Sequence, residues 1–161
     1  MKTEIICLGK LKETYLKEAS AEYEKRLGPY IKLTITELKE ERLHGEGLSA
    51  EKKVIEVEGN RLLSAAEKIN GKPYLIALDS KGKKYDSEGF AKIFMDQAQE
   101  GFDSIVFFIG GSLGLSDEVR KKARLVLSFS DLTFPHQLMR VILLEQIYRA
   151  QKINSGETYH K

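Results

Sequence analysis

The apolar residues of this chain follow two different periods, and short strand-like runs alternate with longer helical stretches. Strands are indicated by short apolar runs that end at glycine, proline or clusters of polar residues. The runs PYLIALD and SIVFFIG are continuously apolar, which is typical of strands covered on both faces. The predicted strands span residues 3–9, 31–38, 73–79, 104–110 and 125–130.

Between these runs, apolar residues recur every three or four positions, as they do along one face of a helix. Thr14 and Ser49 stand where they can cap two of the helices. Because strands and helices alternate, we expect an α/β fold with a mostly parallel sheet flanked by helices. No repeat or linker-like stretch divides the chain, so residues 1–161 are expected to form a single domain. The predicted helices span residues 13–27, 49–69, 86–100, 116–123 and 136–153.

The last predicted helix is apolar around more than one face, with the sequence LMRVILLEQIYRA in its middle. A helix of this kind is buried on most sides. In a small chain a second subunit is the natural cover, so the pattern favours a symmetric homodimer. A charge placed at Leu144 or Ile147 is expected to disrupt that dimer.

Composition narrows the class of protein without identifying it. The net charge is +2, and the basic clusters at 81–84 and 120–124 are interpreted as solvated surface more readily than as phosphate contacts. The single cysteine, Cys7, lies in an apolar run and is expected to be a small buried hydrophobe, so no cysteine metal cluster is predicted. No run is long enough to span a membrane and no signal-peptide pattern is visible, so a cytoplasmic location is expected.

Three predicted strand ends carry the residues best suited to hold a ligand, because ligands of open α/β sheets bind beyond the carboxyl ends of strands. They are Leu78-Asp79, Gly110-Gly111 and the loop 129–134. The glycines let a backbone approach a ligand closely, although a plain tight turn would also need them. A dinucleotide fingerprint is excluded by Ile109, and no Gly-Lys-Ser/Thr triplet forms a phosphate loop. The pattern favours a ligand whose adenine is held by backbone contacts.

Titratable side chains gather at the start and beyond the end of the last helix. His136 follows Pro135 at the helix start, and Tyr159, His160 and Lys161 close the sequence. An ordinary interpretation exists for both groups. His136 can be a hydrogen-bonding residue at a helix start, and the last three residues can be a frayed tail. Taken together with the strand ends, they predict a site made by strand ends, a helix start and a folded-back tail. No histidine pair has metal-ligand spacing, and no G-x-S-x-G elbow is present.

Three stretches resemble one known family over nearly the whole chain. They are IICLGKLKETYLKEASAEYEKRLGPY, FFIGGSLGLS and LSFSDLTFPHQLMRVILLEQIYRAQKINSGETYHK. They are similar to the RlmH-type large-subunit ribosomal RNA methyltransferases of the SPOUT superfamily. The resemblance implies a SPOUT-type sheet with a C-terminal trefoil knot and a homodimer. It also implies methyl transfer from S-adenosylmethionine to N3 of a pseudouridine in helix 69 of 23S rRNA, within the large subunit or the whole ribosome.

The resemblance also assigns site residues. The tail Tyr159-His160-Lys161 matches the RNA side of the family's site, and His160 and His136 are both candidates for the base that removes the N3 proton. The sulfonium donor requires no metal. Two other classes stay open, a non-catalytic RNA-binding α/β module and an enzyme that uses another nucleotide. The implied cofactor contacts are Leu78, Gly110, Phe129, Ser130, Asp131, Leu132, Thr133 and Phe134.

Overall fold

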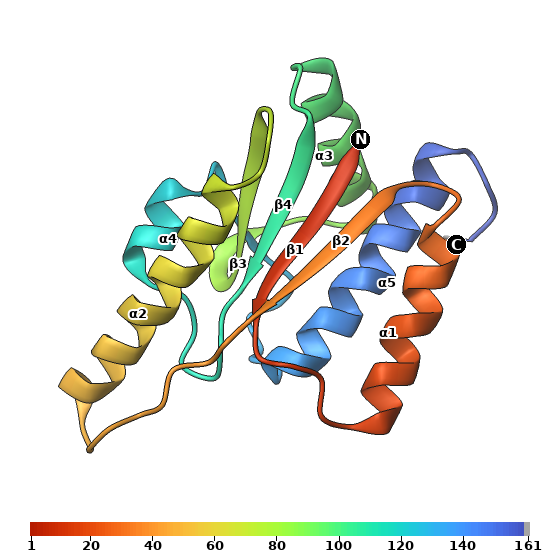
Figure 1. Cartoon of the computed structure of the whole chain (residues 1–161). Coiled ribbons are helices and arrows are strands. Elements are labelled where there is room, and N and C mark those ends of the chain that lie inside the picture. Colours follow the sequence, from red (N-terminus) through yellow and green to blue (C-terminus); the bar gives the residue numbers. More distant parts are fainter. Residues whose placement is uncertain (160–161) are drawn as a thin grey trace.

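Five parallel strands form one sheet in the computed structural model, which describes residues 1–159 of the chain (Figure 1). The strand order is β2-β1-β4-β3-β5, and each neighbouring pair is parallel. This arrangement confirms the predicted α/β class. The trefoil knot implied by the resemblance stays a prediction. The strands are β1 (Lys2–Leu8), β2 (Lys32–Leu38), β3 (Pro73–Lys84), β4 (Ser104–Ile109) and β5 (Leu125–Ser128).

Helices cover both faces of the sheet and make a three-layer architecture (Figure 1). Helices α1, α3 and α5 pack on one face, and α2 and α4 pack on the other. No helix in the described part of the chain has the length and apolar content needed to cross a membrane. The helices are α1 (Thr14–Leu27), α2 (Leu48–Glu67), α3 (Ser87–Gln99), α4 (Asp117–Lys122) and α5 (His136–Asn154).

The uninterrupted apolar sequence of the central strand β4 follows from its place between the two helical layers. Successive side chains of a strand point to opposite faces, so Phe107 enters the core beneath α3 and α5 while Phe108 enters the core beneath α2 and α4. Both are fully buried, and each contributes about 1.5–3 kcal/mol relative to an exposed side chain. Cys7 on β1 is 1% exposed, and burial raises its pKa to about 11, which confirms the prediction of a small buried hydrophobe.

Two local predictions are wrong. The third strand does not end near residue 79 but continues to Lys84, because Lys83 and Lys84 pair with β5 after a register shift that begins at Leu78. The predicted caps also fail, since α1 begins after Glu13 and α2 after Gly47, neither with a side-chain cap. Pairing with β5 determines where β3 ends, and the geometry of the preceding loops determines where α1 and α2 begin. Local residue propensity determines neither.

Helix α5 buries one full stripe in the chain's own core. Leu143, Leu144, Ile147 and Ala150 are completely buried there. The placement of Leu144 and Ile147 at a dimer interface is therefore wrong, and a charge at either position would disrupt the fold of the single chain. Apolar side chains outside that stripe stay partly accessible, among them Leu138 and Ile142.

Candidate functional site

The register shift of β3 at residues 78–80, the carboxyl ends of β4 and β5 and the start of α5 enclose a cavity of about 710 Å³. It brings together seven of the eight residues predicted to contact a cofactor, and His136 joins them in its wall. The exception is Asp131, whose side chain is 78% exposed and forms an ion pair with Lys84 at 2.6 Å. The lining residues are Leu78, Asp79, Ser80, Ile109, Gly110, Gly111, Ser112, Leu113, Gly114, Leu115, Leu127, Phe129, Ser130, Leu132, Thr133, Phe134, Pro135, His136 and Met139.

The glycine turn after β4 forms one wall of this cavity. The backbone N–H of Gly114 donates to the carbonyl of Gly111 at 3.0 Å and closes the turn. A Cβ on Gly110 would lie 2.7 Å from the carbonyl carbon of Gly114, closer than real Cβ atoms approach backbone. Gly110 is therefore required by the turn itself. The predicted approach of its backbone to a ligand is compatible with this packing and stays a prediction.

The loop between β5 and α5 forms the opposite wall. Within it, the Ser128 hydroxyl donates to the carbonyl of Ser130, and the Ser130 hydroxyl accepts from the N–H of Leu132. These hydrogen bonds, of 2.9 and 3.0 Å, give the loop a defined backbone course. The Phe129 ring packs edge-on against Phe90 of α3, which ties the loop to the core. The wall thus offers the apolar side chains of Phe129, Leu132 and Phe134, the polar side chains of Ser130 and Thr133, and the backbone between them.

Arg120 of α4 joins three segments at the rim of the cavity. Its guanidinium donates to Asp79 at 2.9 Å and to the carbonyl of Leu115 at 2.8 Å, and it also pairs with Asp117. These bonds, with the one to Asp117 foremost, hold the pKa of Arg120 above its ordinary value. The sequence predicts Arg120 to be part of a solvated basic cluster, whereas the structure pairs it with two carboxylates. Its partner Asp79 lies 41 residues away, so no local pattern indicated the pair.

A buried arginine, Arg140, anchors the start of α5. Arg140 is 4% exposed, and it donates to Glu37 at 2.6 Å and to the carbonyl of Gly9 at 2.9 Å. One turn earlier, Nε2 of His136 lies 3.3 Å from a carboxylate oxygen of Glu40. Both acidic partners come from β2 and the loop after it. No pattern in the sequence indicates Glu37, Glu40 or Arg140 as residues of the site, because Arg140 and Glu37 are 103 residues apart.

Tyr159 lies at the other end of α5 from the cavity of its own chain. Its hydroxyl donates to Glu145 at 3.2 Å, and its ring stacks edge-on against Tyr148 at 4.9 Å. Burial, followed by the charge of Glu145, raises the pKa of Tyr159. A helix rises about 1.5 Å per residue, so Tyr148 and His136 are roughly 18 Å apart along α5. The structure therefore does not bring Tyr159 into the cavity of the same chain. The other predicted tail residues, His160 and Lys161, lie outside the described residues.

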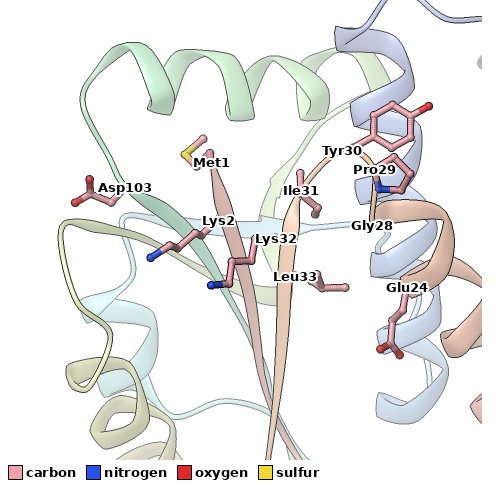
Figure 2. Close-up of a pocket in the computed structure, with 10 residues that line it drawn as sticks. All are labelled: Met1, Lys2, Glu24, Gly28, Pro29, Tyr30, Ile31, Lys32, Leu33 and Asp103. Carbon is pink, nitrogen blue, oxygen red and sulfur yellow. The ribbon is translucent and has the colours of Figure 1, made fainter.

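A second hollow of about 780 Å³ lies at the amino ends of β1 and β2 (Figure 2). Lys2 and Lys32 are partners in the sheet and point together to one side, whereas Leu33 points to the other side (Figure 2). These three side chains of the hollow therefore do not converge on one ligand position. Across residues 1–159, no group of three or more His, Cys, Asp or Glu side chains is placed to hold a metal ion.

Comparison with known proteins shows the family to which this chain belongs. A family model described as "Predicted SPOUT methyltransferase" matches residues 1–160. Proteins named ribosomal RNA large subunit methyltransferase H from Streptococcus uberis, Lactobacillus acidophilus and Clostridium novyi are 49%, 51% and 51% identical to this chain, over 100% of both sequences in each pair. The solved structure of the putative methyltransferase Lpg2936 from Legionella pneumophila with bound SAM matches 93% of this chain and 66% of that chain, with 16% identity and a TM-score of 0.49.

The chain belongs to the SPOUT methyltransferases and, among them, to the family of ribosomal RNA large subunit methyltransferase H. The family resemblance recognised in the sequence is thereby confirmed.

Proposed function

We propose that this protein is an S-adenosylmethionine-dependent methyltransferase that acts on the ribosomal RNA of the large subunit. The observation that carries the proposal is the cavity formed by the irregular part of β3, the ends of β4 and β5 and the start of α5. Three segments far apart in the sequence, at 78, 110 and 129–134, supply its walls. They are the segments that the family resemblance assigns to the cofactor. The relatives at about half identity bear the name of the activity.

The walls of the cavity suit an adenosine-containing sulfonium compound. Leu78, Leu127, Phe134 and Met139 offer apolar surface, and the glycine turn and the 129–134 loop offer backbone hydrogen-bonding groups. The chain lacks the common phosphate-binding motifs, and this donor has no phosphate to hold. When bound, it supplies an electrophilic methyl group. The residues of this chain orient it toward the nucleic acid.

The target we propose is N3 of a pseudouridine in helix 69 of 23S rRNA. Alkylation at N3 requires loss of a proton, and a positioned base contributes on the order of 10²–10⁴ in rate. Two titratable side chains line the cavity, Asp79 and His136. Asp79 is already bound by Arg120, so His136 is the better candidate for the proton acceptor among the described residues.

We further propose a cytoplasmic homodimer that covers the outer face of α5. Tyr159 packs on Tyr148, which lies roughly 18 Å along α5 from His136 in the cavity wall of the same chain. Its predicted role at the RNA side of the site therefore requires the cavity of another chain. Packing of two chains on α5 brings the tail of one chain toward the cavity of the other. In this arrangement the dimer completes each active site.

Two measurements test the proposed function. Calorimetry with S-adenosylmethionine should show one site per chain, whereas ATP and NAD should not bind. Incubation with labelled donor and naked 23S rRNA, large subunits or whole ribosomes should label one base in helix 69 in at least one substrate. A purely RNA-binding module predicts no donor affinity. Binding of another nucleotide in place of the donor would overturn the assignment of the cavity.

A further inference from the structure

The environment of His136 contains one polar partner whose role no comparison assigns. Nε2 of His136 is buried from solvent and makes no hydrogen bond of good geometry. It lies 3.3 Å from Oε1 of Glu40, in the loop after β2. His136 nevertheless lines the cavity. Because Nε2 is buried beside Glu40, Nδ1 is the ring nitrogen that can serve a group in the cavity.

Gly9 determines where the Glu40 carboxylate lies. Its φ is +76°, and a Cβ there would lie 2.8 Å from the carboxylate carbon of Glu40. Its N–H donates to Leu38 at 2.7 Å, and its carbonyl accepts from Arg140 at 2.9 Å. Gly9 thus provides a flat backbone surface, fixed on both sides, against which the carboxylate packs. The Glu40 carboxylate is consequently positioned by its packing against the Gly9 backbone.

Three other charged groups around the start of α5 and the cavity have partners of their own. Arg140 binds Glu37 and the Gly9 carbonyl. In the β2–α2 loop, Glu41 binds Arg61 at 2.5 Å. The first turn of α5 contains no acidic residue. Across the cavity, Asp79 is bound by Arg120. These pairings leave Glu40 as the carboxylate that faces His136.

We propose that Glu40 is a positioning residue that orients His136 and selects the tautomer with the proton on Nε2. A proton on Nε2, stabilised by the carboxylate oxygen 3.3 Å away, leaves the Nδ1 lone pair free to accept a proton. The role in methyl transfer rests on the proposed function. There, the N3 proton of the target base moves to Nδ1, N3 forms its bond to the methyl carbon, and the carbon–sulfur bond breaks with its electron pair on sulfur. The resulting imidazolium lies beside the Glu40 carboxylate, which offsets its charge.

The orienting role can be tested without any activity measurement. The chain has three histidines, so ¹⁵N NMR resolves their imidazoles, and His136→Gln identifies the signal of His136. We expect the wild-type ring to carry its proton on Nε2 at a pH where it is neutral. In Glu40→Gln the proton should be distributed over both nitrogens. Glu41→Gln, in the same loop but facing Arg61, is the matched control and should leave the His136 signal unchanged.

The catalytic consequence is measured on the same variants. Glu40→Gln should lower kcat about tenfold or more while the donor Kd changes less than about twofold, and Glu40→Asp should recover part of kcat. Glu41→Gln should keep kcat, and melting curves establish that each variant is folded. An unchanged His136 tautomer in Glu40→Gln would overturn the proposal, as would an equal loss of kcat in Glu41→Gln. If the wild type fails to methylate any ribosomal substrate, the proposed function fails, and the NMR measurement still decides whether Glu40 orients His136.

Discussion

The protonation of a single side chain depends on its surroundings in the fold, and the buried Glu58 of α2 shows this most clearly. It is 4% exposed, and one of its carboxylate oxygens accepts from the N–H of Glu41 at 3.1 Å. Burial raises the pKa of Glu58, and the charge of Glu40 acts in the same direction, whereas the hydrogen bond from Glu41 and the charge of Arg61 oppose it. The fold thus tolerates a buried carboxyl that is easier to accommodate when protonated.

This environment predicts a pH-dependent effect of Glu58→Gln. A carboxyl with a raised folded pKa costs stability as pH rises from its unfolded pKa through its folded pKa, and below that window the cost is absent. Glutamine keeps an acceptor for Glu41 and removes the charge. The melting temperature of the variant relative to wild type should therefore increase between pH 4 and pH 8, by about 2–4 °C for each 1 kcal/mol.

The control for this measurement is Glu56→Gln on the same helix, because its side chain is 59% exposed. The difference between Glu56→Gln and wild type should stay nearly constant over the same pH range. A pH-independent difference for Glu58→Gln would mean that the buried carboxyl is not the source of the effect.

Among the elements, the glycine turn after β4 is the one most sensitive to a single atom. Gly110→Ala places a Cβ against the backbone of Gly114 and Leu115, which cannot move without opening the turn. We expect a loss of about 1–3 kcal/mol in the free energy of unfolding and a weaker affinity for the donor. Urea denaturation and calorimetry measure the two effects.

Gly28→Ala is the matched control for the turn. Gly28 ends α1 in a right-handed helical conformation, and the nearest atom to an added Cβ is 3.4 Å away. This variant should be neutral or more stable by about 0.4–1 kcal/mol. If Gly110→Ala behaved like Gly28→Ala, the turn would be more adaptable than its backbone contacts indicate.

Helix α5 carries the prediction about assembly. Its outer face includes Ile142, which lines a hollow with Phe134 and Gln146 and is only partly buried in one chain. Ile142→Glu should convert the dimer to a folded monomer in light scattering, because a charge cannot be buried unpaired in an interface. Leu48→Glu, at an 84% exposed position on α2, should leave the dimer intact. A wild-type protein that is monomeric at micromolar concentration would contradict the dimer.

At the scale of the whole molecule, the distance between tail and cavity predicts complementation between chains. A His136→Ala chain retains its tail, and a chain lacking residues 159–161 retains its cavity. Neither should methylate alone. After mixing and subunit exchange, half of the dimers combine one of each and contain one complete site, so about a quarter of wild-type activity should return. No recovery after verified exchange would show that the tail does not act across the dimer.

The sequence by itself determined the elements and the edge of the sheet that carries the site. The uninterrupted apolar run SIVFFI predicts a strand buried on both faces, and β4 is such a strand. The sequence predicts Leu78, Gly110 and the 129–134 loop as the positions that hold a ligand, and the cavity forms there, although β3 continues beyond Leu78 to Lys84. These predictions succeed because hydrophobic periodicity is local and because parallel strands present their carboxyl ends at one edge.

The tertiary structure alone decided the polar contacts that hold the site. Arg140 meets Glu37, Arg120 meets Asp79, and His136 meets Glu40 across segments that share no local pattern. The same holds for the extension of β3 along β5, which depends on a register shift between strands. Such pairings follow from strand order and helix placement in three dimensions. A buried charge is acceptable only where a partner arrives from elsewhere in the chain, and only the folded chain shows which partner arrives.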